Sequence, residues 1–133
     1  MVNTTLTHNR PKYLGLRAIL FEIRLPLSGW VSILHRLSGA LLFLSTVWLL
    51  FMLDRSLDSS YSFDSVKREL SVPAVRFALL LLIWAYCHHF CAGIRYLFLD
   101  LGKGVERAAA QFTSGVVVAV SLLLTTWLGM KLW

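Results

Sequence analysis

Two groups of ionisable residues interrupt otherwise apolar stretches of this sequence, and they are its main candidates for chemistry. The first group, in SILHRLSG at 32–39, contains Ser32, His35 and Arg36. Because Ser32 precedes His35 by three residues and Arg36 by four, a helix projects all three from one side. A hydroxyl, an imidazole and a guanidinium can together hydrogen-bond a carbonyl oxygen, stabilise negative charge and transfer a proton. The competing interpretation is that Arg36 reaches the lipid headgroups and His35 is an ordinary interface residue.

The second group lies in AYCHHFCAGIRYLFLD, residues 85–100, where two adjacent histidines stand among apolar residues. His88 and His89 point about 100° apart on a helix, so they are not expected to share one task. The residues one helical turn from His89 are all small: Ala85, Ala92 and Gly93. A flat macrocycle fits against such a floor, and histidine is a common ligand of haem iron, so His89 is a candidate axial ligand. The alternative is a structural histidine that hydrogen-bonds a neighbouring helix.

A haem held by two histidines needs a second ligand, and this chain offers no suitable one beyond His89. His8 lies in the polar N-terminal stretch, and His35 lies near a helix end. If His89 binds haem, the second ligand therefore comes from another subunit. Cys87 and Cys91 are too few for an iron–sulfur cluster held by four thiolates, and we interpret them as packing residues. The sequence has no dinucleotide-binding glycine motif and no P-loop, so flavin and iron–sulfur chemistry would reside in partner proteins.

These candidates require membrane-spanning helices to position them. Of the 133 residues, 57% are hydrophobic, and the mean hydropathy is +0.68, which is typical of a membrane protein. Three stretches of 17, 18 and 23 residues contain no charged residue: those between Arg36 and Asp54, Arg76 and Arg95, and Arg107 and Lys131. A helix of about 20 apolar residues crosses a bilayer. We therefore expect an all-α membrane protein, one domain over residues 1–133, with transmembrane helices at about 30–53, 74–99 and 108–131.

The segments outside these helices indicate the orientation of the chain. We expect an N-terminal segment at about 1–29 with a short interfacial helix at 13–24, and loops at 54–72 and 100–107. The side of the membrane that holds the N-terminal segment and the second loop carries eight basic residues, including those at the adjoining helix ends: Arg10, Lys12, Arg17, Arg24, Arg36, Arg95, Lys103 and Arg107. The opposite side carries five: Arg55, Lys67, Arg68, Arg76 and Lys131. This bias places the N-terminus in the cytoplasm.

The same residues bear on location and partners. The first 30 residues contain no secretory signal, and Pro11, Glu22 and Pro26 argue against a mitochondrial transit peptide. A bacterial inner membrane is therefore favoured over the mitochondrial inner membrane. The net charge of +6 indicates topology and contact with the headgroups of the lipid bilayer rather than binding of nucleic acid.

Three blocks of the sequence resemble a known family. RPKYL at 10–14, SILHRLSG at 32–39, and H-x-x-x-GIR-x-x-x-x-D-x-G from His89 to Gly102 resemble, in order and spacing, the cytochrome b membrane-anchor subunits of succinate dehydrogenase, complex II. The resemblance implies three transmembrane helices that pack with a second anchor subunit in a helical bundle. It also implies that a flavoprotein subunit and an iron–sulfur subunit attach to the anchor and pass electrons from succinate to ubiquinone.

The resemblance further implies roles for individual residues. Ser32 and Arg36 match the family's quinone-site residues, and Arg36 with His35 matches the vicinity of the haem propionates and the quinone pocket. His89 matches the axial ligand of haem b, whose other histidine comes from the second anchor subunit. Asp100 matches an acidic residue at the end of the second helix, and its role stays open.

The chain departs from many bacterial members at Tyr96, where they have the histidine of GIRH. This difference weakens any role for a second histidine at that position, whereas haem ligation by His89 is unaffected. Two alternatives stay open: an anchor of the fumarate-reductase type that oxidises menaquinol, and a purely structural anchor whose histidines bind nothing.

Overall fold

The computed structural model describes residues 25–132, and every regular element in that range is an α-helix. The helices are α1 (Leu27–Asp58), α2 (Ser60–Leu70), α3 (Pro73–Asp100) and α4 (Arg107–Gly129). Three of them, α1, α3 and α4, are long and apolar enough to cross a membrane, which confirms the expected all-α membrane fold. The expected interfacial helix at 13–24 and the RPKYL block at 10–14 lie outside the described residues.

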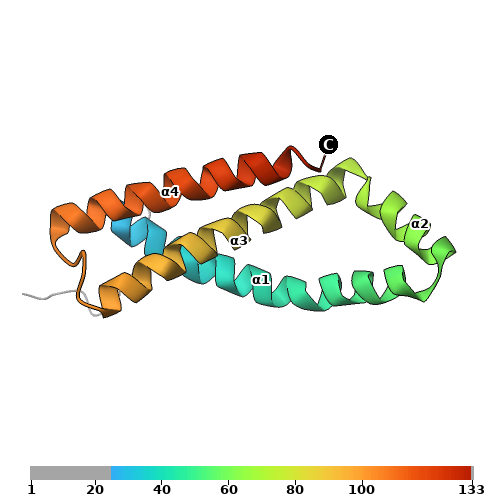
Figure 1. The fold of residues 1–133 in the computed structure, drawn as a ribbon, viewed down its shortest axis with the longest axis horizontal. Coiled ribbons are helices and arrows are strands. Elements are labelled where there is room, and N and C mark those ends of the chain that lie inside the picture. Colours follow the sequence, from blue (N-terminus) through green and yellow to red (C-terminus); the bar gives the residue numbers. More distant parts are fainter. Residues whose placement is uncertain (1–24, 133) are drawn as a thin grey trace, which may run out of the picture.

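The three long helices pack lengthwise, and helices that follow one another in the chain run in opposite directions (Figure 1). The start of α1, the end of α3 and the start of α4 therefore meet at one end of the bundle. This end contains His35 and His89, and we call it the histidine end. The other end contains α2, the start of α3 and the end of α4.

α4 packs against α3 through a row of small and polar residues. The buried residues of α4 recur every three or four positions: Ser114, Val117, Ser121, Thr125 and Gly129. A Cβ on Gly129 would lie 2.7 Å from Leu80 Cδ1, so the Leu80 side chain occupies the space that a larger residue would need. The buried hydroxyls of this row donate to backbone carbonyls of α4 itself. Small residues let helix backbones approach closely in a membrane, where association depends on van der Waals packing.

The prediction of a loop at 54–72 is wrong, because α1 continues to Asp58 and α2 occupies most of the residues from there to 72. The Ser59 side chain accepts a hydrogen bond from the Ser62 backbone N–H at 3.2 Å and caps α2. The apolar residues of α2 recur on one face and line a cavity against α1 and α3: Phe63, Val66 and Leu70. Packing of this face stabilises a helix in a segment whose polar composition indicated a loop.

An ion pair joins α2 to α1. Both terminal nitrogens of Arg55 donate to the Glu69 carboxylate, at 3.0 and 2.8 Å. These hydrogen bonds lower the pKa of the Glu69 carboxyl. Paired donation of this kind fixes the relative orientation of two planar groups, so it orients α2 across the ends of α1 and α3.

The connection between α3 and α4 depends on two glycines. Gly102 and Gly104 have φ angles of +72° and +79°, a conformation that residues with a side chain rarely adopt. The Lys103 backbone N–H donates to the Phe98 carbonyl at 3.0 Å and closes the end of α3. This short connection returns α4 along α3 and sets the start of α4 beside the end of α3.

Candidate functional site

Two histidines from different helices form the centre of the candidate site. The imidazole rings of His35 on α1 and His89 on α3 stack with their centroids 4.2 Å apart and their planes 7° apart. His89 Nδ1 lies 3.0 Å from the backbone carbonyl oxygen of His35. Ser38 Oγ donates to the same carbonyl at 3.0 Å and lies 3.4 Å from His89 Nδ1. One turn of α1 therefore holds the His89 ring by both stacking and hydrogen bonding.

Glycines in both helices make this close approach possible. A Cβ on Gly39 would lie 2.7 Å from Cε1 and 3.1 Å from Nδ1 of His89. On the facing helix, a Cβ on Gly93 would lie 3.7 Å from His35 Nε2. Each histidine thus lies over a glycine of the other helix, and the His89 ring leaves no room for a methyl group at residue 39.

The hydrogen bonds decide which nitrogen of His89 remains available. A carbonyl oxygen only accepts hydrogen bonds, so His89 Nδ1 carries the hydrogen and donates it to His35. The neutral ring then has its lone pair on Nε2. Metal-binding histidines commonly donate their other ring N–H to a backbone carbonyl, which fixes the ring and raises its basicity. The arrangement therefore fits a ligand that binds through Nε2.

The surroundings distinguish His89 from its neighbour His88. His89 is half-buried, whereas His88 is 1% exposed and stacks on Trp84 with ring centroids 5.5 Å apart. The buried Nε2 of His88 has no hydrogen-bond partner within residues 25–132. A group shared with another subunit could reach only His89 of the two, because this chain's own side chains and helices enclose His88.

The prediction that Ala85, Ala92 and Gly93 form an open surface for a macrocycle beside His89 is wrong. Ala85 and Ala92 are completely buried in the packing of the helices, and His35 lies over Gly93. Helical spacing places these residues beside His89, but it does not reveal that other helices cover that face. The surface against the His89 ring is provided instead by Gly39 of α1.

A shallow groove of about 480 Å³ adjoins the histidine pair, between the start of α1, the end of α3 and the start of α4. Its polar lining includes Ser32 and Arg95, and Tyr96 forms part of its wall. The Tyr96 ring centroid lies 5.0 Å from that of His35, so the groove and the histidine pair share a boundary.

Arg95 was not among the residues that the sequence singled out, yet it is the buried cation of this groove, with 7% of its surface exposed. Its Nε donates to Thr113 Oγ1 at 3.0 Å, and its Nη2 donates to the Ala110 carbonyl at 3.3 Å. No carboxylate of the described residues pairs with Arg95, although a buried charge is costly without a counter-ion. The sequence did contain a signal for Arg95, because a basic residue at the edge of an apolar membrane stretch is itself a candidate functional-site residue.

The remaining sequence candidates differ in their surroundings. Ser32 lines the groove, whereas Arg36 and Asp100 are exposed and lie outside its lining. Neither Arg36 nor Asp100 forms a hydrogen bond or ion pair with the part of the chain that the structure describes. The structure therefore brings His35 and His89 together, places Ser32 in the adjoining groove and leaves the other two at the surface of this chain.

Comparison with known proteins gives one consistent family. The family described as succinate dehydrogenase/fumarate reductase transmembrane subunit matches residues 7–128. The succinate dehydrogenase cytochrome b556 subunit of Rickettsia prowazekii is 33% identical, with 80% of each chain covered. That of Rickettsia bellii is 36% identical over 74% of this chain and 77% of the relative. That of Coxiella burnetii is 29% identical over 86% of this chain and 92% of the relative.

Proposed function

The chain belongs to the succinate dehydrogenase/fumarate reductase transmembrane subunit family, and we propose that it is the cytochrome b subunit of a succinate:quinone oxidoreductase. In this role it anchors the catalytic subunits, helps to bind haem b and forms part of the site at which ubiquinone is reduced. It has no activity alone, because succinate oxidation takes place in partner subunits. The observation that carries the proposal is the orientation of His89, with Nδ1 bonded to His35 and Nε2 left for a ligand.

His89 is the residue of this chain that would hold the haem iron. Its half-buried position supports a haem shared with a second anchor subunit, which would supply the other histidine ligand. Haem b, when bound, supplies a one-electron redox centre. The hydrogen bond to His35 keeps the proton on Nδ1, and the stacked His35 ring covers one face of the imidazole.

The groove at the histidine end, together with Arg36, is proposed to bind quinone. The Ser32 hydroxyl donates a hydrogen bond to a quinone carbonyl oxygen, and the Arg36 guanidinium stabilises the negative charge that develops during reduction. Arg95 contributes a positive charge from within the groove lining, whereas Arg36 lies outside that lining. His35 lies at the boundary between the groove and His89, where an imidazole can hold or transfer a proton.

The proposal also covers the position of the chain in the cell. Residues 1–133 form a single membrane-anchor domain, and the histidine end faces the cytoplasm in a bacterial inner membrane. The iron–sulfur and flavoprotein subunits attach on that side. The excess of basic residues in the N-terminal segment and the α3–α4 connection supports this orientation.

The haem ligand is tested by two substitutions in the purified complex. His89→Ala is expected to remove most of the b-type absorbance from the reduced-minus-oxidised spectrum, because it removes the nitrogen that binds iron. His88→Phe is the matched control, since it keeps an aromatic ring beside Trp84 and should leave the spectrum unchanged. An unchanged spectrum in His89→Ala, with all subunits present, would mean that His89 does not bind haem.

Two other functions give different results in the same preparation. An enzyme of the fumarate-reductase type would oxidise menaquinol, and the family description includes fumarate reductase. The curated relatives are named succinate dehydrogenase, which favours the first function. A purely structural anchor would give no b-type absorbance in the wild-type complex.

A further inference from the structure

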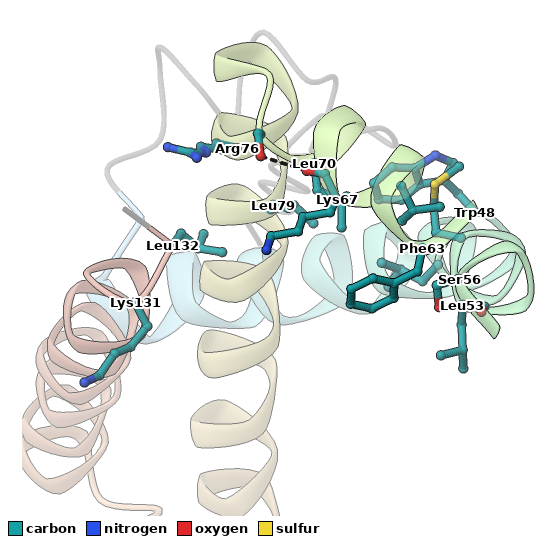
Figure 2. A pocket seen from close by; sticks show the side chains of 14 residues that line it. Trp48, Leu53, Ser56, Phe63, Lys67, Leu70, Arg76, Leu79, Lys131 and Leu132 are labelled. Carbon is teal, nitrogen blue, oxygen red and sulfur yellow. Dashed lines mark hydrogen bonds between the residues drawn. The ribbon is translucent and has the colours of Figure 1, made fainter. Parts of the chain in front are cut away.

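A cavity of about 570 Å³ lies at the end of the bundle opposite the histidine pair (Figure 2). Its walls come from the last turns of α1, from α2, from the start of α3 and from the residues after α4. Most of the lining is apolar, and three cationic residues line it as well: Lys67, Arg76 and Lys131. No carboxylate of the described residues lines it.

The cavity extends from the membrane surface into the apolar layer. Arg76 and Lys131 each stand at the edge of an uncharged stretch, so both lie at the depth of the lipid headgroups. Trp48 lies seven residues before Arg55 on α1, which at 1.5 Å per residue is roughly 10 Å deeper in the membrane. The cavity therefore has a cationic rim and an apolar floor, which is the polarity of a lipid headgroup above its acyl chains.

The charges at this end of the bundle are separated from one another. The acidic residues Asp54 and Asp58 line a different, polar hollow together with Arg55. Both oxygens of the Glu69 carboxylate accept hydrogen bonds from Arg55. Lys67 forms no ion pair with the described residues, and Figure 2 shows its side chain directed from α2 towards Leu132. The charged residues that line the cavity in the described part of the chain are thus all basic, although the loop region contains four acidic residues: Asp54, Asp58, Asp64 and Glu69.

We propose that this cavity binds an anionic phospholipid, with Lys67 as the main contact of the phosphate and Arg76 and Lys131 on the rim. The acyl chains lie against the apolar residues deeper along α1 and α3, such as Trp48 and Leu79. A zwitterionic phospholipid fits less well, because its ammonium group would meet cations and no carboxylate among the described lining residues. The bound lipid fills the corner between α1, α2 and α3, and its contacts hold α2 at the membrane surface.

The test uses Trp48, which lines the cavity, as the reporter in the intact, delipidated complex. Phosphatidylglycerol with brominated acyl chains is titrated in neutral detergent, and the Trp48 signal is the difference between the wild type and Trp48→Phe. Saturable quenching is expected in the wild type. The double variant Lys67→Gln/Lys131→Gln should need a roughly 30-fold higher lipid concentration for half-maximal quenching. The reason is that each basic residue near an anionic lipid raises the binding affinity about fivefold.

Arg68→Gln is the matched control, since Arg68 is an exposed cation of α2 outside the cavity lining, and its titration should equal that of the wild type. Equal quenching by brominated phosphatidylcholine would overturn the proposal, as would an unchanged titration in the double variant. Displacement by millimolar inorganic phosphate would show a free-anion site instead of a lipid site. Complete absence of Trp48 quenching in the intact complex would show that a partner subunit fills the cavity.

Discussion

The space beside His89 allows no side chain at residue 39, so Gly39→Ala is expected to disturb the candidate site directly. The new Cβ would lie 2.7 Å from His89 Cε1 and 3.1 Å from Nδ1, closer than van der Waals contact permits. Because the Cβ is fixed to the backbone of α1, the imidazole must turn away. It then loses the hydrogen bond to the His35 carbonyl and the stacking with the His35 ring.

These two interactions of the His89 ring set the size of the effect. A hydrogen bond contributes about 0.5–1.5 kcal/mol, and a stacked aromatic pair contributes about 0.5–1.5 kcal/mol. Their sum of about 1–3 kcal/mol corresponds to a roughly 5- to 150-fold loss of affinity for a ligand that needs this ring orientation. The change from glycine to alanine also favours the helix by about 1 kcal/mol, but that gain does not restore the orientation of the ring.

The assay is the haem content of the purified complex, measured as b-type absorbance per amount of protein. Gly115→Ala is the matched control, because it gains the same helix propensity and its Cβ meets only Leu27 Cδ2, at 3.9 Å. We expect Gly39→Ala to lose haem during purification and Gly115→Ala to retain it. Equal haem content and identical spectra in Gly39→Ala and the wild type would refute the reasoning that Gly39 and His35 confine the His89 ring.

The remaining predictions concern charged residues. Arg36→Ala and Arg95→Gln should each lower quinone reduction about tenfold or more, the expected effect of losing a charged hydrogen bond, while succinate-dependent dye reduction persists. Thr113→Ala removes the contact with Arg95 Nε and the hydrogen bond that Thr113 Oγ1 donates to the Ala110 carbonyl, but it keeps the Arg95 charge, so it should have a smaller effect. A loss of dye reduction as large as the loss of quinone reduction would indicate failed assembly. The hydrogen bonds from Arg55 lower the pKa of the Glu69 carboxyl in the folded protein. The ion pair should therefore stabilise the α1–α2 corner at pH values above the pKa of Glu69 in the unfolded chain, about 4.3. This stabilisation should be lost as the pH falls through the lower pKa of Glu69 in the folded protein. Pepsin cleavage of α2 should therefore rise with acidification in the wild type more than in Glu69→Gln, and identical pH profiles would contradict this.

Most of the fold could be predicted from the order of charged and apolar residues. Each uncharged stretch forms a long helix, because a membrane requires the backbone polar groups of a segment to be satisfied within that segment. Gly102 and Gly104 mark the end of α3 for a local reason, their positive φ angles. α2 could not be predicted in this way, since a short helix is marginal alone and depends on packing of residues such as Val66 and Leu70.

By itself, the sequence determined which residues could do chemistry and at which end of the bundle they lie. Consecutive spanning helices alternate in direction, so the start of the first and the end of the second had to share one membrane face, with His35 and His89 near it. That conclusion needs only helix length and chain order.

Only the tertiary structure decided which of these side chains meet. Apolar residues cover all faces of a membrane helix, so their pattern does not mark the face that packs on a neighbour. Helical spacing gives the angle of each residue about its own axis, whereas the rotation of one helix against another is set by close packing. That rotation encloses His88, buries Arg95 and lays the ring of His89 over Gly39, where the His35 carbonyl holds it.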